Sequence, residues 1–475
     1  MNLKVKNVAA FIFFVLLLMG MVFISRSSVD SSSESTDLES EVFLALVINT
    51  KVTRPVNSPF GVQIYGSSES SSKYYADIDE SRASWIRNMV FWATVESKNT
   101  TPDNYNWAYS DRLFAAAGES DGFNMIGNIE TNPTWASTVK RGVINKVPMS
   151  EFAEFVGAMV ERYDADGFKD APGSPRVTHW ELYNEPDRAE SWGDHPKEYA
   201  EMLEAVYPAV KAASAEAQVV FGGIAHDGFT EQGGPFVRNF TEEVLKNGGG
   251  PNFDVMNIHT YPVFNLRWAN SGIGLIEKVD AVRGILAKYV QGSKPMIITE
   301  AGWHSDSPPG FPSNQKLQSE MLVKLFAQSI AADVKIMIWW MLYDSGDHNF
   351  DNGLVTNGSP PVRKQSFYTY QNMASKLESA NFHGLQKTSA SAGQQFVIEL
   401  YPFTKTDGQQ VYIIYRSPVG TNNDNGQTVH QRLAHSKVTL RDITTDAVIK
   451  VIVDSDADGH VDVPATARPV YVEVG

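Results

Sequence analysis

The chain has 475 residues, of which 43% are hydrophobic and 20% charged, a composition typical of a folded protein with a large apolar core. Its 40 Lys and Arg against 55 Asp and Glu give a net charge of -15. Such a surface repels phosphate backbones, so we expect no nucleic-acid partner. The chain contains no cysteine, which excludes disulfides, thiolate nucleophiles and cysteine-based metal sites.

The first 26 residues predict a membrane anchor. Lys4 and Lys6 precede an unbroken apolar run, Val8–Ile24, which as a helix would span about 26 Å of the roughly 30 Å hydrocarbon core. Arg26 interrupts the candidate cleavage site, so an uncleaved signal anchor is favoured over a cleaved signal peptide or a buried core helix. The basic residues before the run favour an orientation with the N-terminus inside and the rest of the protein outside the membrane. We therefore expect a cell-envelope protein that is tethered to the membrane, or secreted if the signal is cleaved.

Residues 27–50 predict a flexible linker. The stretch up to Glu41 is rich in serine and carries only acidic charges after Arg26. A segment of this composition cannot bury enough apolar surface to order itself.

Residues 51–380 predict a (β/α)8 barrel. Short apolar or β-branched runs alternate with helical patterns, which is typical of parallel βαβ units. A doubly wound open sheet is the alternative, but no glycine-rich phosphate loop follows the first run. The eight predicted strands are Phe60–Ile64, Trp85–Val90, Asn124–Ile129, Val177–Leu182, Gln218–Gly223, Phe253–Ile258, Pro295–Thr299 and Lys335–Met341. The clearest helical patterns are Glu151–Tyr163, Pro196–Ser214, Gly274–Tyr289 and Lys316–Ala331.

Two of the predicted strand ends carry a glutamate. Glu185 lies in an Asn-Glu-Pro sequence after the fourth strand, and Glu300 follows the seventh. Barrel closure brings these ends to one face. A lone glutamate at such a position is usually a helix cap or a surface residue. Two together supply the acid and the nucleophile that glycosidic cleavage needs, so we expect Glu185 and Glu300 to be catalytic.

At these residues the sequence resembles the glycoside hydrolases of clan A. The resemblance implies that Glu185 is the acid/base and Glu300 the nucleophile. Further features are similar to family 39 of that clan and extend the likeness over residues 55–475. These features are Arg87, Trp92–Glu96, Tyr105–Trp107, Gly353–Val355, the closing helix Lys364–Leu377 and a C-terminal β domain.

The neighbouring residues have expected roles around the pair. Burial and the charge of Glu300 should raise the pKa of Glu185. Arg87 and Tyr261 should keep Glu300 ionised, although Arg87 could also be an ordinary buried ion-pair partner. Asn184 can hydrogen-bond the sugar 2-hydroxyl.

Three ring side chains complete the predicted site. His259, with Tyr261, ends strand six and should orient the carboxylates, unless it is a structural histidine. Trp340 ends strand eight and offers a flat apolar face to a sugar. Trp135, after strand three, either lines a sugar subsite or belongs to the core. We expect no metal and no cofactor, because His259 alone of the ten histidines stands at a predicted strand end.

Residues 381–475 predict a β-sandwich, which either binds carbohydrate or packs on barrel helices. The predicted strands are Gln395–Leu400, Gln410–Arg416, Lys437–Leu440, Ala447–Val453 and Val470–Val474. Asp454–Gly459 matches the opening of a calcium loop, but Ala465 stands where a bidentate glutamate belongs. An acidic hairpin turn is favoured there.

The sequence as a whole predicts a retaining glycoside hydrolase that cleaves O-glycosidic bonds of an extracellular or periplasmic polysaccharide by double displacement. A transglycosylase would use the same site. An inactive, membrane-tethered carbohydrate-binding scaffold is the alternative from another class. The architecture also resembles bacterial hydrolases that trim exopolysaccharide.

Overall fold

The computed structural model describes residues 54–65, 71–115, 122–264, 268, 272–345, 350–389, 396–418 and 426–475. The predicted anchor (1–26) and linker (27–50) lie outside these ranges. Among the helices within them, none has the length and apolar character needed to cross a membrane.

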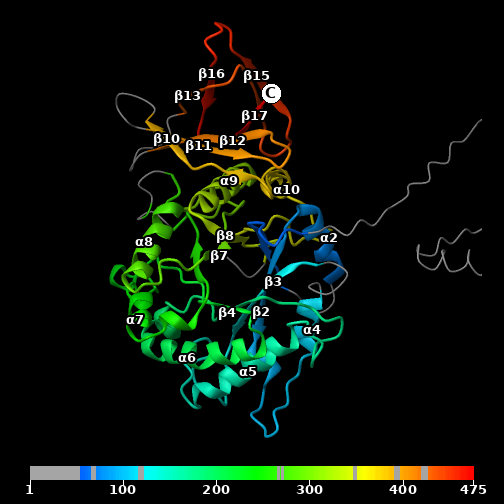
Figure 1. Ribbon diagram of the computed structural model, residues 1–475, viewed down its shortest axis with the longest axis vertical. Coiled ribbons are helices and arrows are strands. Elements are labelled where there is room, and N and C mark those ends of the chain that lie inside the picture. The colour runs from blue at the N-terminus through cyan, green and yellow to red at the C-terminus, as the bar shows by residue number, and fades with distance from the viewer. Residues whose placement is uncertain are drawn as a thin grey trace, which may run out of the picture. The chain divides into compact units, whose positions relative to one another are not determined.

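Eight parallel strands form one sheet in the order β5-β4-β3-β2-β1-β8-β7-β6 (Figure 1). Parallel bridges Val220↔Val255 and Ile224↔Ile258 join the β5 and β6 edges, so the sheet is a nearly closed barrel. All eight predicted strands are confirmed, and the open doubly wound alternative is wrong. The strands are β1 Phe60–Gln63, β2 Trp85–Phe91, β3 Asn124–Glu130, β4 His179–Leu182, β5 Gln218–Val220, β6 Met256–Thr260, β7 Met296–Ala301 and β8 Val334–Trp339.

The interior of the barrel is apolar in one layer and polar in the next. Buried side chains from five of the strands, with Val255 beside β6, form a separate apolar cluster: Trp85, Ile126, Val220, Val255, Ile297, Ile336 and Ile338. Because alternate residues of a strand face the same side, Arg87 lies on the same face of β2 as Trp85 and one layer further along. Polar groups therefore gather toward the carboxyl ends of the strands, the usual position of a barrel active site.

Amphipathic helices cover the strands and bury their apolar faces against them (Figure 1). The five predicted helices are confirmed as α5, α6, α8, α9 and α10. The helices are α2 Ser71–Ser81, α3 Trp92–Val95, α4 Ala108–Phe114, α5 Met149–Arg162, α6 Pro196–Ala213, α7 Phe240–Lys246, α8 Leu275–Lys288, α9 Gln315–Ala331 and α10 Gln365–Leu377, with a short π-helix at Ala189–Gly193.

The C-terminal part is antiparallel. A seven-stranded sheet contains β9 Asn381–Phe382, β10 Gln386–Ser389, β11 Phe396–Thr404, β12 Gln410–Pro418, β14 Lys437–Arg441, β15 Val448–Val453 and β17 Val470–Val474. A smaller sheet pairs β13 Val429–Leu433 with β16 Val461–Ala465. The sequence analysis did not predict these two strands, nor β9 and β10 of the larger sheet. Apolar side chains of both sheets share one core, for example Ile414 of the large sheet and Val463 of the small one.

The sequence suggested that the acidic loop Asp454–Gly459 is a hairpin turn, and this prediction is wrong. The loop connects β15 of the large sheet to β16 of the small sheet, so the chain crosses between sheets there. Asp454 stabilises the crossing because its carboxylate accepts the backbone N–H groups of Asp456 at 3.2 Å and Gly459 at 2.7 Å.

Charged side chains join the antiparallel domain to the barrel helices. Lys376 of α10 is buried, and its Nζ lies 2.7 Å from Glu473 Oε1 and 2.8 Å from Asp446 Oδ1. On α9, Gln328 donates to Glu399 of β11 at 3.3 Å. These contacts fit the packing role for the domain.

Replacing Lys376 by methionine should lower the free energy of unfolding by about 2 kcal/mol, because a buried charged hydrogen bond is lost. Glu473 would keep only Arg441 as a cationic partner. Denaturant titration measures the change, with Lys335→Met at the exposed pair to Asp333 as the control. Equal unfolding midpoints for both variants would contradict a structural role of this pair.

Candidate active site

Arg87 is the fully buried centre of the polar layer, and all five of its N–H donors have acceptors. Its Nε and Nη2 bind the two carboxylate oxygens of Glu181 at 2.7 and 2.8 Å. Nη2 also donates to Asn184 Oδ1 at 2.8 Å. Nη1 donates to Gln63 at 3.1 Å and to Glu300 Oε1 at 2.9 Å. One side chain thus holds residues from β1, β4, the loop after β4, and β7.

The charge of Arg87 is stable in this buried position. Burial alone would lower the pKa of Arg87, but the negative charges of Glu181 and Glu300 raise it. Glu181 was not predicted as a site residue. The sequence did indicate Glu181, because it places a carboxylate inside an apolar strand, and a buried charge there requires a partner.

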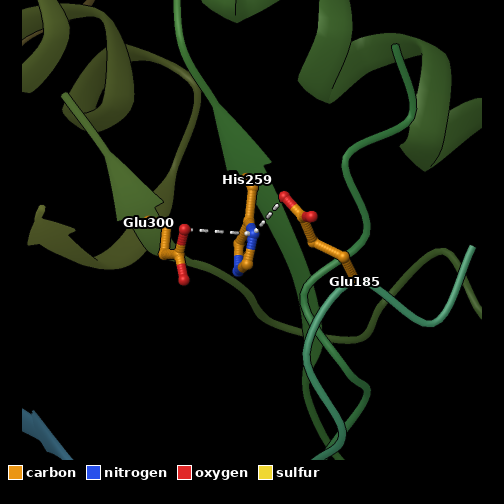
Figure 2. A group of neighbouring side chains, drawn as sticks. All are labelled: Glu185, His259 and Glu300. Carbon is orange, nitrogen blue, oxygen red and sulfur yellow. Dashed lines mark hydrogen bonds and ion pairs between the residues drawn. The ribbon is translucent and has the colours of Figure 1, made fainter. Parts of the chain in front are cut away.

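The predicted catalytic pair meets around His259 (Figure 2). His259 Nδ1 lies 3.3 Å from Glu185 Oε1 and 3.7 Å from Glu300 Oε2. One ring nitrogen and one oxygen from each carboxylate all lie within 4.8 Å of one another. The other ring nitrogen, Nε2, is 3.1 Å from Thr299 Oγ1, which fixes the ring plane. Residues 115 positions apart therefore face the same point.

The loop after β4 holds Glu185 in an uncommon backbone conformation. Tyr183 has a φ of 64° and Glu185 a φ of 46°, in the left-handed region that costs non-glycine residues free energy. The Glu185 N–H donates to Gly223 O at 3.1 Å, and Asn184 forms a parallel bridge with Gly223. The β5 end thus stabilises the strained turn that aims the carboxylate inward.

Glu300 is oriented from both sides. Arg87 donates to Oε1, and the Tyr261 hydroxyl donates to Oε2 at 2.9 Å. The carboxylate of Glu300 therefore has two fixed donors, as predicted for Arg87 and Tyr261. Trp340, directly after β8, is 8% exposed and donates from Nε1 to the Tyr65 hydroxyl at 3.1 Å.

The charge state of Glu185 differs from the expectation. Burial alone would raise its pKa, but the hydrogen bond and charge of His259, and the charge of Arg188, hold the pKa of Glu185 below its usual value. Arg188 Nη2 lies 3.1 Å from Glu185 Oε2. The expected raised pKa of Glu185 is therefore wrong, because two cationic neighbours outweigh burial. Burial opposes the charge of His259 in turn, yet Glu300 and Glu185 raise its pKa.

Two hollows open at these residues. The first, of about 670 Å³, is lined by Asn184, Glu185, Glu300 and Trp340, among others. The second, of about 380 Å³, contains His259 and Tyr261 and again Glu185. Glu185 therefore lines both hollows, whereas Glu300 lines the first. Because Arg87 holds the Asn184 carbonyl, the Asn184 amide NH₂ is left to face the first hollow.

Trp135 does not line either hollow. Its indole Nε1 donates to the Glu96 carbonyl at 3.2 Å, and its ring packs edge-on against Trp92 at 5.1 Å. The loop after β3 turns this side chain onto α3 instead of toward the sugar site. The sequence left two interpretations of Trp135, a sugar subsite or the core. The structure supports the core.

Several residues around the site were not predicted. Glu130 ends β3, is 1% exposed, and its pKa is raised by burial. Tyr65 follows β1. The strand-end positions of these two residues were a usable signal. Arg141 and Arg188, which lie in the loops after β3 and β4 and line the first hollow, gave no comparable signal.

The spacing of Glu185, His259 and Glu300 could also suit a cation. Arg87 and Arg188 already contact the two carboxylates, so a divalent ion there would meet two guanidinium charges at close range. This donor set is a poor fit for a metal. Among the described residues, two partly or fully exposed aspartate groups have similar spacing: Asp164, Asp166 and Asp170, and Asp454, Asp456 and Asp458.

Comparison with known proteins gives a consistent result. Residues 50–346 match the family model for cellulase (glycosyl hydrolase family 5). Among curated proteins, none matches the chain in sequence.

Similar solved structures include several glycoside hydrolases. A family 39 glycoside hydrolase from the gut symbiont Bacteroides cellulosilyticus WH2 shares 20% identity, covering 89% of this chain and 81% of that one, with a TM-score of 0.66. A GH39 β-xylosidase from Caulobacter crescentus shares 15% identity over 89% and 97%, with a TM-score of 0.57. A GH39 enzyme from Xanthomonas axonopodis pv. citri shares 12% over 89% and 95%, with a TM-score of 0.58. At these identities the likeness shows the fold.

Replacing Gly223 by alanine should displace the His259 ring, because a Cβ there would lie 2.1 Å from His259 Nε2. We expect a loss of about 1–3 kcal/mol in stability. The pKa of His259, followed by NMR, should fall toward its ordinary value as the ring leaves the carboxylates. Gly284→Ala is the control, since its Cβ meets nothing within 4 Å. An unchanged His259 titration in Gly223→Ala would contradict this account.

Proposed function

Because the chain belongs to the cellulase family, glycosyl hydrolase family 5, and is a glycosidase similar to family 39 enzymes of clan A, we propose that it cleaves a polysaccharide with retention of configuration. The supporting observation is the distance between the paired glutamates, whose nearest oxygens lie within 4.8 Å. Retaining enzymes have carboxyl groups about 5–5.5 Å apart, whereas inverting enzymes need about 6.5–9.5 Å to admit a water.

In the first step, Glu300 attacks the anomeric carbon while Glu185 protonates the departing glycosidic oxygen. Arg87 and Tyr261 bind one oxygen each of Glu300, which fixes the orientation of the carboxylate. The bond to the leaving sugar breaks, and a covalent glycosyl ester of Glu300 forms. The Asn184 amide is placed to bind the 2-hydroxyl, a contact that strengthens in the transition state.

The acid proton comes from the Glu185–His259 pair. Both carboxylates raise the pKa of His259, and His259 in turn lowers the pKa of Glu185, which favours the proton on the imidazole ring. The atoms His259 Nδ1 and Glu185 Oε1 are 3.3 Å apart, so the proton can pass to the carboxyl group when a sugar excludes water from the site. The pair then titrates as a unit.

In the second step, Glu185 acts as the base. It removes a proton from water, and the resulting hydroxide attacks the anomeric carbon and releases Glu300. A sugar hydroxyl in place of water would give transglycosylation at the same site. We also retain the proposal that the enzyme acts outside the cytoplasm, which rests on the apolar run at residues 8–24.

Glu300→Gln should reduce turnover of aryl glycosides and polysaccharide by about a thousandfold or more, because no nucleophile is left. Glu190→Gln is the control, since Glu190 is 79% exposed in its side chain. In the wild type, NMR of the first product should show the same anomer as the substrate. Normal turnover by Glu300→Gln would contradict the assignment, and an inverted product would contradict the retaining mechanism.

Glu185→Ala should hydrolyse natural linkages poorly, yet azide should restore activity on aryl glycosides whose leaving group needs no proton. Azide should attack the glycosyl ester from the face opposite Glu300 and give a product with the configuration of the substrate. Absence of rescue, or a product of inverted configuration, would argue against Glu185 as the acid/base.

A further inference from the structure

The charges that the first hollow exposes are positive. Arg141 and Arg188 line it with side chains that are 59% and 37% exposed. Its three carboxylates are far less accessible, at 17% for Glu185, 10% for Glu300 and 6% for Asp344. A ligand entering the hollow therefore meets guanidinium groups first, in a chain whose net charge is -15.

Each covered carboxylate already has a cation that fixes it. Glu300 is bound to Arg87 at 2.9 Å, and Asp344 to Lys364 Nζ at 2.7 Å. Both of these cations are buried. Behind its surface the wall of the hollow is thus close to neutral. Arg188 and Arg141, which pair with Glu185 and Glu130, are the cations whose side chains are exposed to a substrate.

Arg188 stands next to the bond that is cleaved. It lines both hollows together with Glu185, and its Nη2 is 3.1 Å from that carboxylate. Its guanidinium lies over the Phe236 ring at 5.0 Å from the ring centroid, which limits its orientations. Its other carboxylate neighbour, Glu190, is 3.6 Å away and largely exposed, a geometry that contributes little.

Arg141 is held beside the same loop. The Ser191 hydroxyl donates to the Arg141 carbonyl at 2.6 Å, so the loops after β3 and β4 are joined there. Its guanidinium reaches Glu130 Oε1 at 3.2 Å and is otherwise open to solvent. Two guanidinium groups that line the same hollow form a suitable site for a planar carboxylate or a sulfate.

We propose that Arg188 and Arg141 bind an anionic substituent on a sugar beside the scissile linkage, so that the substrate is an acidic polysaccharide. The inference rests on the proposed hydrolase function and adds the substrate class. The substituent takes the place of Glu185 as the partner of Arg188. That exchange removes one of the two cations that keep Glu185 ionised, and so helps the acid to hold its proton when substrate is bound.

The test compares one polysaccharide with and without its anionic groups. A panel of uronate-containing, sulfated and neutral polysaccharides is screened with the wild-type enzyme, and the fastest substrate is then carboxyl-reduced or desulfated. We expect an acidic polysaccharide to be fastest, and removal of its anion to lower kcat/KM about tenfold or more. The treatment that lowers the rate identifies the anion as uronate or sulfate.

The variants assign the effect to the arginines. In Arg188→Gln, and in the double variant with Arg141→Gln, the ratio of kcat/KM for the native and the neutralised polysaccharide should fall toward one. Arg176→Gln, at an exposed pair with Glu216, should keep the wild-type ratio. Because both substrates are measured on the same protein, a folding or catalytic defect cancels in the ratio.

Two outcomes would overturn the inference: a neutral polysaccharide as the fastest substrate, or a wild-type ratio in the double variant. Either one leaves the proposed hydrolase standing as long as turnover still requires Glu300. Loss of the Glu300 requirement would instead remove the proposed function itself.

Discussion

The buried guanidinium of Arg87 is the interaction on which the rest of the site depends. A charge this deep is tolerated only when every donor has a partner, and here the partners come from four different places around the barrel. Glu181 compensates the charge bidentately, which lets Arg87 also hold Glu300 and Asn184. Loss of any one of these strands from the barrel would leave a buried N–H donor of Arg87 without its acceptor, so fold and site are coupled.

The position of His259 between the two glutamates depends on the missing side chain at Gly223. Gly223 on the β5 side has no side chain, and the ring occupies that volume. There one ring nitrogen of His259 and one oxygen of each carboxylate all lie within 4.8 Å of one another. The lowered pKa of Glu185 is compatible with the proposed acid role, because His259, whose pKa both carboxylates raise, has its Nδ1 3.3 Å from Glu185 Oε1.

The loops after β3 and β4 contribute charged side chains that the barrel strands do not. Arg141 and Arg188 project from the loops after β3 and β4, and both loops are joined through Ser191. The proposed nucleophile Glu300 lies on a barrel strand and the proposed acid Glu185 on a loop, and Arg141 and Arg188 add exposed charge from the loops. The antiparallel domain takes part differently, since its contacts described above go to α9 and α10.

The sequence by itself determined the eight strands of the barrel, four of its long helices and the position of Glu185 and Glu300 after two of the strands, because period, spacing and strand-end position are local properties. It also indicated Arg87 and Tyr261 as partners of Glu300, through the resemblance and the barrel geometry. Only the tertiary structure decided the charge of Glu185, the turn of Trp135 onto α3 and the crossing of Asp454–Gly459 between two sheets. These depend on which distant groups come within a few ångströms, and hydrogen bonds and Coulomb energies are set by those distances and not by sequence separation.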